Sequence, residues 1–533
     1  MTAARHRSGA RGTGTPVRIL VAVLLAVLAS CTVGPSTRPP LATSGAAGPV
    51  ATSTTAGSRP LGPGGPGRSA DPVTWGSCPS AVDPVDPVTK EEFRLQCADV
   101  DVPKVYTDAS AGRLSISVVR ASGPKTPADA PPLFVVLGEP GENGTERAAT
   151  VAGTVSAALL DRFAVIVLDL RGTGGSVAID CVSGQNSRAL LSPALDPAAT
   201  EAGSQLTELS RSLTFDCGDM VGPELSDYST VLAADDVDTV RAALGADRID
   251  FLGEGFGATL GAVYADRYPG RVRTAVLDAP SDPSLTPDKQ ALAVAAAQQQ
   301  ALVSFAGACP TFSGGCPLGT DPAGAVRELV TSLGDVGGAS SDGYEITGGS
   351  VLLALADRLG TPTTWPQLAA ALAAARGGNL DPVSEIVQQG LGGTDVARQQ
   401  SGRLVYRCND SAQRLGGTEL AAAATAARGA APLFGPFDVG LVGVCASWPA
   451  TETPLAAVRA TGAPPLLVVG AAEDPVAPYS SVRSLTTQLD SATLLTWQSG
   501  THGAYPTSNC VAAAVNAYLL GGTAPAAGTL CPP

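Results

Sequence analysis

Short apolar runs alternate with longer helical stretches between about residues 110 and 280. The runs are rich in Val, Ile, Leu and Phe, and most are followed by a turn and then a helix-like stretch. Buried strands joined by helices predict a mostly parallel sheet with helices on its faces. The expected strands are residues 114–119, 133–137, 164–168, 249–252 and 272–277.

The pattern changes between residues 285 and 440, where alanine, glutamine and leucine dominate. Such composition predicts a mainly helical insertion. The sheet pattern then returns with expected strands at 466–470 and 493–497 and a last helix at about 508–520. We therefore expect an α/β body formed by 73–284 and 441–533, interrupted by a helical cap or lid at 285–440.

The first residues predict a targeting segment. Four arginines precede a short apolar stretch, which ends in Leu-Ala-Ser before Cys31. This arrangement is typical of a signal peptide and resembles a bacterial lipobox, in which the cysteine is acylated. We expect a lipoprotein signal at 1–31, lipidation of Cys31, and a disordered Pro/Gly/Ser/Thr/Ala-rich tether at 32–72. The alternative is an ordinary secretory signal with an incidental cysteine.

These features predict an exported protein, either anchored to the outer face of the cytoplasmic membrane or secreted. The lipid is the only expected contact with a membrane, because no later apolar run resembles a transmembrane helix. The formal net charge of -14 argues against nucleic-acid binding.

Cysteine usage agrees with export. Without Cys31 an even set of cysteines remains, and such a set in an exported protein indicates disulfides. The order along the chain favours pairing of neighbours, although other connectivities stay open: Cys78–Cys97, Cys181–Cys217, Cys309–Cys316, Cys408–Cys445 and Cys510–Cys531. We expect no metal site and no cofactor, since no C-x-x-C pair is present and the only histidines are His6 and His502.

Residues 251–261 carry the clearest candidate chemistry. A buried strand runs into a glycine-rich turn and then a helix, as in the G-x-S-x-G nucleophile elbow. Gly253 and Gly257 hold the flanking glycine places, and Glu254 and Phe256 hold the two variable places. Gly255 stands where the chemistry needs serine.

Two further residues follow in the order that a catalytic triad of this class requires. Asp474 comes after the strand at 466–470, and His502 comes after the strand at 493–497. In a working triad the histidine takes the proton of the serine and the aspartate orients the ring. The sequence thus predicts an acid and a base without a nucleophile.

Several ordered motifs extend this pattern over residues 73–533. They are W-x-x-C at 75–78, C-A-x-V-x-V-P at 97–103, G-E-P-G at 138–141, D-L-R-G-T-G-x-S at 169–176, D-P-V-A-P-Y at 474–479 and T-H-G at 501–503. Together they resemble the tripeptidyl-aminopeptidase family of secreted serine exopeptidases, which are related to proline iminopeptidases. The resemblance implies an α/β-hydrolase fold and a Ser–Asp–His triad. It places the oxyanion loop at Gly138, Glu139 and Phe256.

The sequence departs from that family pattern at functional places. Gly255 replaces the nucleophile, so no acyl-enzyme forms there. Glu139 takes the second glycine of the oxyanion loop, where a carboxylate opposes a developing negative charge. Ala477 stands where the family often has threonine. We expect the side chain of Glu254 to point away from His502.

These sequence features leave three alternative functions. The first is a catalytically impaired surface protein that keeps a pocket for short peptides or amine-bearing ligands. The second is residual hydrolase or exopeptidase activity, through water activated by His502 and Asp474 or through another nucleophile such as Glu254. The third is a passive scaffolding lipoprotein of the cell envelope.

Overall fold

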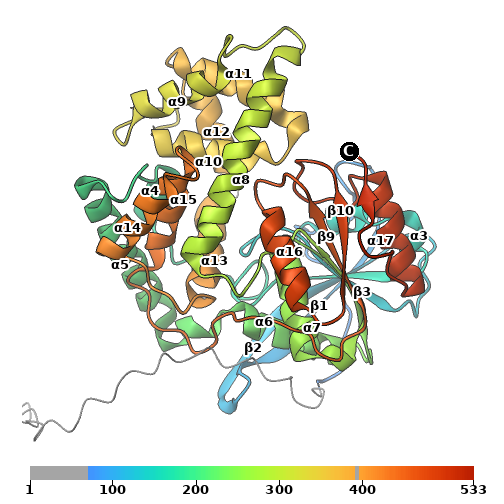
Figure 1. The fold of residues 1–533 in the computed structure, drawn as a ribbon. Coiled ribbons are helices and arrows are strands. Elements are labelled where there is room, and N and C mark those ends of the chain that lie inside the picture. The colour runs from blue at the N-terminus through green and yellow to red at the C-terminus, as the bar shows by residue number, and fades with distance from the viewer. Residues whose placement is uncertain (1–69, 391–394) are drawn as a thin grey trace, which may run out of the picture. The chain divides into compact units, whose positions relative to one another are not determined.

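The computed structural model describes residues 70–390 and 395–533 (Figure 1). The expected signal, the lipidation site Cys31 and nearly all of the tether lie outside these residues. Within them the chain forms a nine-stranded sheet in the order β1-β2-β4-β3-β5-β6-β9-β10-β11. In sheet order the strands are β1 Arg94–Val105, β2 Asp108–Ser122, β4 Ala164–Leu168, β3 Pro132–Val136, β5 Ile249–Glu254, β6 Val272–Asp278, β9 Leu466–Ala471, β10 Ala492–Trp497 and β11 Leu530–Cys531.

The strands from β4 to β11 run parallel, whereas β2 is antiparallel to both β1 and β4. This confirms the expected α/β fold with a mostly parallel sheet. The expected strand at 114–119 is only the middle of β2, and β1 was not expected. Both strands are long and partly exposed, so they lack the short apolar run that marks a buried parallel strand.

Helices cover both faces of the sheet because successive strand side chains point to opposite sides. Phe134, Ile166 and Phe251 face α6 (Thr230–Ala243), α7 (Phe256–Arg267) and α16 (Tyr479–Gln488). Leu133 and Val165 face α2 (Ala148–Thr154), α3 (Ala157–Leu160) and α17 (Asn509–Gly521). Both faces of the sheet are thereby buried. The candidate site lies at the edge of the sheet that is formed by the carboxyl ends of the parallel strands.

Eight helices lie between β6 and β9 in the described chain. They are α8 Pro287–Ala308, α9 Pro322–Leu333, α10 Gly348–Leu359, α11 Trp365–Arg376, α12 Asp381–Gly390, α13 Val396–Asn409, α14 Gly417–Ala427 and α15 Phe434–Val442. A small hairpin, β7 (Gly338–Ala339) and β8 (Glu345–Ile346), lies among them. Their apolar sides share buried clusters separate from the sheet core. We call this helical region the cap.

Two earlier helices also pack with the cap. α4 (Gly184–Leu191) contacts α10 and α13, and α5 (Thr200–Val221) contacts α14. Figure 1 shows α4, α5, α14 and α15 side by side. The helical layer is therefore not confined to 285–440, because α5 presents the apolar residues Leu206, Leu209 and Leu213 toward it.

One helix in the described chain, Pro287–Thr311, is long and apolar enough to cross a membrane by length and composition. Its residues Leu302 and Phe305 are buried in the cap core. One side of this helix therefore packs against the cap core, and a third of its apolar window is buried.

Five disulfides join the cysteines in the expected neighbour order. The pairing predicted from the sequence is thus confirmed. Two of them act on the cap: Cys181–Cys217 ties the segment before α4 to α5, and Cys408–Cys445 ties the end of α13 to the turn after α15.

Candidate active site

The glycine-rich turn lies between β5 and α7, at the carboxyl edge of the sheet. Gly255 has φ 58° and ψ -118°, a backbone conformation that residues other than glycine rarely adopt. The flanking glycines allow a close approach of strand and helix. A Cβ on Gly253 would lie 2.4 Å from the carbonyl oxygen of Gly257, and a Cβ on Gly257 would lie 2.0 Å from that of Val136. The turn thus has the geometry of a nucleophile elbow.

Asp474 and His502 meet beside this elbow. Asp474 is buried, and its Oδ1 accepts the N–H groups of Val476 at 2.8 Å and Ala477 at 3.0 Å. Its Oδ2 lies 2.9 Å from His502 Nδ1. The backbone N–H of His502 donates to the carbonyl of Gly360 at the end of α10, at 2.9 Å. The core fixes the aspartate, and the cap holds the histidine loop.

The histidine faces the empty place at Gly255. A Cβ built on Gly255 would lie 3.6 Å from His502 Nε2 and 3.8 Å from Glu139 Oε1. A serine hydroxyl, one bond beyond that Cβ, would come within hydrogen-bonding reach of Nε2. The structure therefore brings together the three residues that the sequence assigns to the triad positions, with the nucleophile position lacking a side chain.

The electrostatic surroundings of His502 favour its charged form. Burial alone would lower the pKa of His502, but Asp474, and then Glu254 and Glu139, raise it to about 9. At neutral pH the imidazole is therefore protonated. An imidazolium cannot accept a proton from a hydroxyl or a water, so His502 is a poor general base in this state.

The oxyanion loop has an acidic side chain folded onto it. The N–H of Glu139 donates to Glu142 Oε1 at 3.4 Å. A Cβ on Gly138 would lie 2.6 Å from Glu142 Oε2, so the carboxylate covers that glycine. Arg147 pairs with Glu142 at 2.5 Å, and Arg403 of α13 lies 3.7 Å from it. A donor that should face an oxyanion instead faces a carboxylate.

Glu254 does not point away from His502 as the sequence analysis expects. A Cβ on Gly503 would lie 2.7 Å from the Glu254 carboxyl carbon, so this carboxyl packs against the residue after the histidine. Burial raises the pKa of Glu254, and His502 opposes that rise. The expectation fails because the loop after β10 folds back over the end of β5.

Asp278 is a site residue that the sequence reasoning missed. It ends β6 directly opposite Glu254 in the sheet register. Its Oδ2 accepts the N–H groups of Ala504 at 2.9 Å and Tyr505 at 2.8 Å, while its Oδ1 has no hydrogen-bond partner among residues 70–390 and 395–533. Burial and then Glu254 raise its pKa to about 7. The sequence signal that could have identified Asp278 is an aspartate that directly follows an expected strand close to the elbow.

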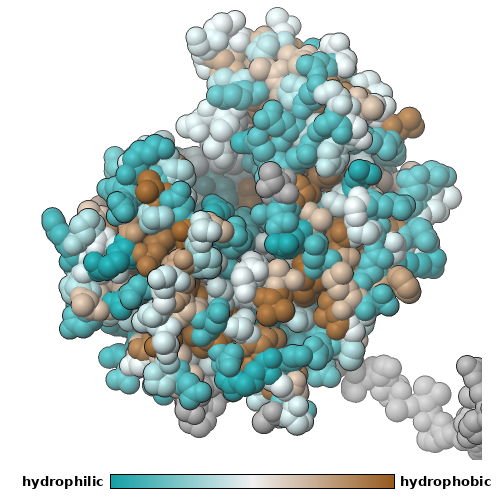
Figure 2. Space-filling view, turned by 180° about the vertical axis from the view of Figure 1, so that it is seen from behind, coloured by the Kyte–Doolittle hydropathy of each residue, from teal (hydrophilic) through white to brown (hydrophobic). Residues whose placement is uncertain are grey.

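The hollow between cap and body is visible in Figure 2. Two cavities lie elsewhere. One of about 330 Å³ is lined by Trp75 and Arg120 among others, and one of about 280 Å³ is lined by Cys97 and Asn143 among others. Neither is lined by His502 or Gly255. We place the candidate site at the elbow on the basis of its chemistry, not of cavity size.

The strand order, the elbow and the histidine–aspartate pair define an α/β-hydrolase. Residues 131–327 match the model of the alpha/beta hydrolase fold, and residues 431–531 match the model described as TAP-like protein. The chain is 30% identical to the "Serine protease Hip1" of Mycobacterium tuberculosis, over 88% of this chain and 93% of that protein. The chain belongs to the TAP-like α/β-hydrolase family.

Other relatives carry different names. The "Carboxylesterase B" of Mycobacterium tuberculosis is 30% identical over 86% of this chain and 90% of its own. The "Tripeptidyl aminopeptidase" of Streptomyces lividans is 25% identical over 82% of this chain and 84% of its own. Among solved structures, the proline iminopeptidase of Mycobacterium smegmatis is 15% identical over 79% of this chain and 97% of that chain, with a TM-score of 0.34, too low to support further comparison.

Proposed function

We propose that this protein is a catalytically impaired TAP-like hydrolase that binds short peptides or amine-bearing ligands outside the cytoplasm. The observation that carries the proposal is the glycine at the place that His502 Nε2 faces, since a backbone without a side chain supplies no nucleophile.

Two further observations support the loss of catalysis. The N–H of Glu139 is occupied by the Glu142 carboxylate, and the Glu139 carboxylate itself lies 3.8 Å from the place of a Cβ on Gly255, where it would oppose a developing negative charge. The raised pKa of His502 also works against water activation, which is the main route to residual hydrolysis. Residual activity is therefore the less supported alternative.

Acidic side chains favour a cationic ligand. Glu139, Glu142 and Glu254 surround the elbow, and a free amino group would be attracted to them. Family membership supports the peptide class, since a tripeptidyl aminopeptidase and a serine protease are among the relatives.

The disulfides support a location outside the cytoplasm. We further propose that Cys31 carries a lipid that anchors the protein to the cell envelope. Replacement Cys31→Ala should then move the protein from the membrane fraction to the medium or the soluble fraction. Unchanged membrane association would count against the anchor.

Calorimetry with trialanine and N-acetyl-trialanine tests the binding role. The proposal expects trialanine to bind at least about ten-fold more tightly, because acetylation removes the charge that the carboxylates attract. Equal affinity, or no binding of either peptide, would contradict an amine-binding pocket and favour a passive scaffolding role.

A further inference from the structure

The cavity of about 330 Å³ lies at the opposite edge of the sheet from the elbow. It is lined by Pro132 and Ala164, which begin the parallel strands β3 and β4, whereas Gly255 follows the carboxyl end of β5. The end of helix α6 also lines it, through Ala242 and Leu244. The cavity is therefore separate from the candidate active site, and the proposed function leaves it unassigned.

The chain that leads into the α/β body forms one wall of this cavity, which includes Trp75. Just before Trp75, the N–H of Val73 donates to the carbonyl of Ala243 at 3.0 Å. Just after it, Gly76 and Cys97 of β1 exchange two backbone hydrogen bonds, at 2.8 and 3.0 Å. Cys97 also belongs to the first disulfide. Contacts on both sides of Trp75 therefore hold the wall in place.

Arg120 of β2 is the only ionisable residue among the described residues that line the cavity. The other lining side chains are apolar, among them those of Trp75, Ile166 and Leu244. The Nη2 of Arg120 donates to the carbonyl of Ala128 at 2.6 Å. Its Nε is buried and has no hydrogen-bond partner in the described part of the chain. The guanidinium thus keeps an unused donor, and a carbonyl does not neutralise its charge.

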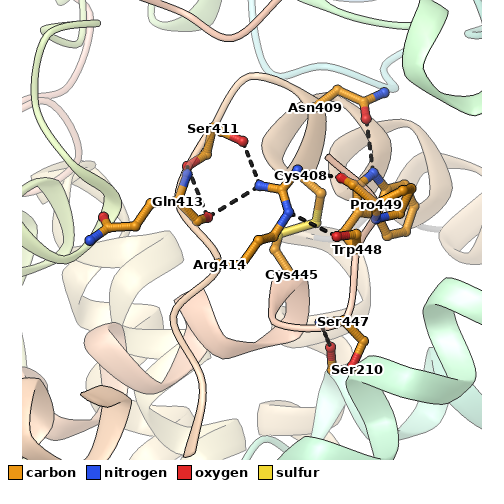
Figure 3. Close-up of a disulfide and its surroundings, with 10 residues drawn as sticks. All are labelled: Ser210, Cys408, Asn409, Ser411, Gln413, Arg414, Cys445, Ser447, Trp448 and Pro449. Atoms are coloured by element: carbon orange, nitrogen blue, oxygen red, sulfur yellow. Dashed lines mark hydrogen bonds between the residues drawn. A yellow bond between two sulfur atoms is a disulfide. The ribbon is translucent and has the colours of Figure 1, made fainter. Parts of the chain in front are cut away.

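Two other arginines that are withdrawn from solvent are better satisfied. Arg171 forms a buried ion pair with Asp236. Arg414 has no such partner, but its guanidinium donates to backbone carbonyls on two segments of the chain, as Figure 3 shows. Within the described ranges Arg120 has neither kind of environment. A charge withdrawn from water costs free energy unless it is paired, so this site favours an added anion.

The chain itself offers no such anion. The diagonal neighbour of Arg120 on the paired strand β1 is another cation, Arg94. Burial, and then the charge of Arg94, lower the pKa of Arg120. Residues 1–69 and 391–394 contain no aspartate or glutamate, so the parts of the chain outside the description cannot supply a side-chain carboxylate. An anion that pairs with Arg120 therefore has to come from another molecule.

We propose that this cavity binds a small carboxylate with an apolar tail, such as a medium-chain fatty acid, with the carboxylate on Arg120 and the tail along Trp75 and Ile166. The planar guanidinium matches the geometry of a carboxylate. Ligand pockets have volumes of about 300–1,000 Å³ and an apolar lining with few placed polar groups, and this cavity fits the lower end of that range. The site does not depend on what the elbow binds.

Calorimetry on the full chain with octanoate and octanamide tests this site. The two probes carry the same tail, but only octanoate is charged at neutral pH. The wild type is expected to bind octanoate at least about ten-fold more tightly, since only the carboxylate forms a charge-assisted pair with Arg120. Arg120→Gln should abolish this preference. Arg113→Gln, at an exposed arginine of the same strand, is the matched control and should leave it intact.

A second variant tests the cavity itself. Ala242→Leu keeps Arg120 and places a good helix former in α6, but its larger side chain fills part of the cavity. It should weaken octanoate binding at least about ten-fold. Equal affinity of the wild type for both probes, or a preference that survives Arg120→Gln in a folded protein, overturns the carboxylate site. Unchanged octanoate affinity in Ala242→Leu, or no binding of octanoate at millimolar concentration, also overturns it.

Discussion

At the scale of the residue, glycine at position 255 has two consequences. It leaves the elbow without a nucleophilic side chain, and it occupies without strain a backbone conformation that costs other residues energy. Apart from its two neighbours in the chain, the nearest described atom to a Cβ on Gly255 would be His502 Nε2 at 3.6 Å, so the penalty for a side chain there is conformational and not steric. Glycine at this position is thus compatible with a more stable elbow.

The first prediction concerns this strain. Gly255→Ser and Gly255→Ala should each lower the free energy of unfolding by about 1–3 kcal/mol, because both must adopt the left-handed φ. Chemical denaturation measures it. Alanine is the control for the hydroxyl, so similar losses are expected. A serine variant as stable as the wild type would show that the elbow relaxes.

A second prediction concerns the charge of His502. It is the only histidine in residues 70–533, so its ring signals can be followed by NMR. They should titrate near pH 9 rather than near 6.5. The pKa of His502 is higher in the folded protein than in the unfolded chain. The charged ring therefore stabilises the fold fully below about pH 6.5, and this contribution is lost as the pH rises through 9.

The control for that titration is Asp474→Asn, which removes the nearest negative charge and should lower the pKa of His502. A wild-type titration close to the ordinary value would contradict the cationic state. It would also restore His502 as a usable base and strengthen the case for residual hydrolysis.

At the scale of the element, the loop at 138–142 matters as much as the elbow. The Glu142 carboxylate binds the N–H of Glu139 and is held by Arg147 and by Arg403 of the cap. In the proposed impaired hydrolase this contact is a second obstacle to catalysis, besides the glycine at the elbow.

This predicts how a restored nucleophile behaves. Gly255→Ser/Glu142→Gln should react with a fluorophosphonate probe at least about ten-fold faster than Gly255→Ser alone, because one oxyanion donor is worth about 10²–10³ in rate. Glu146→Gln, at an exposed neighbouring acid, is the matched control and should have no effect. Equal rates for the two Glu142 forms would show that this carboxylate does not obstruct the hole.

The elements were only partly predictable. The buried strands at 164–168 and 466–470 could be located because each is a short apolar run that ends at a turn. The position of Glu142 could not be predicted, because Arg403, which helps to hold it, comes from a helix about 260 residues later. A single arginine in a helix carries no local signal.

At the scale of the whole molecule, the sheet provides the acid, the base and the elbow, while the cap closes over them. Gly360 of the cap binds the His502 backbone, and α13 covers the oxyanion loop. The order of sheet segments, and the approach of Asp474 and His502 to the elbow, could be predicted from the sequence. The participation of α4 and α5 in the cap could not, because tertiary contacts alone decide which layer an amphipathic helix joins.

The disulfide Cys408–Cys445 gives a prediction at this scale. Its removal by Cys408→Ala/Cys445→Ala should lower the free energy of unfolding by about 2–4 kcal/mol. Chemical denaturation measures this loss. A double variant as stable as the wild type would mean that the surrounding hydrogen bonds suffice.

The most direct test of the central claim is labelling with a fluorophosphonate probe, on the wild type and on Gly255→Ser side by side. The wild type is expected not to react, and the serine variant is expected to react slowly and only while His502 is present. That result would identify an α/β-hydrolase whose acid and base remain in place without a nucleophile. Labelling of the wild type itself would contradict the account, because another residue would then be the nucleophile and the protein would be an active hydrolase.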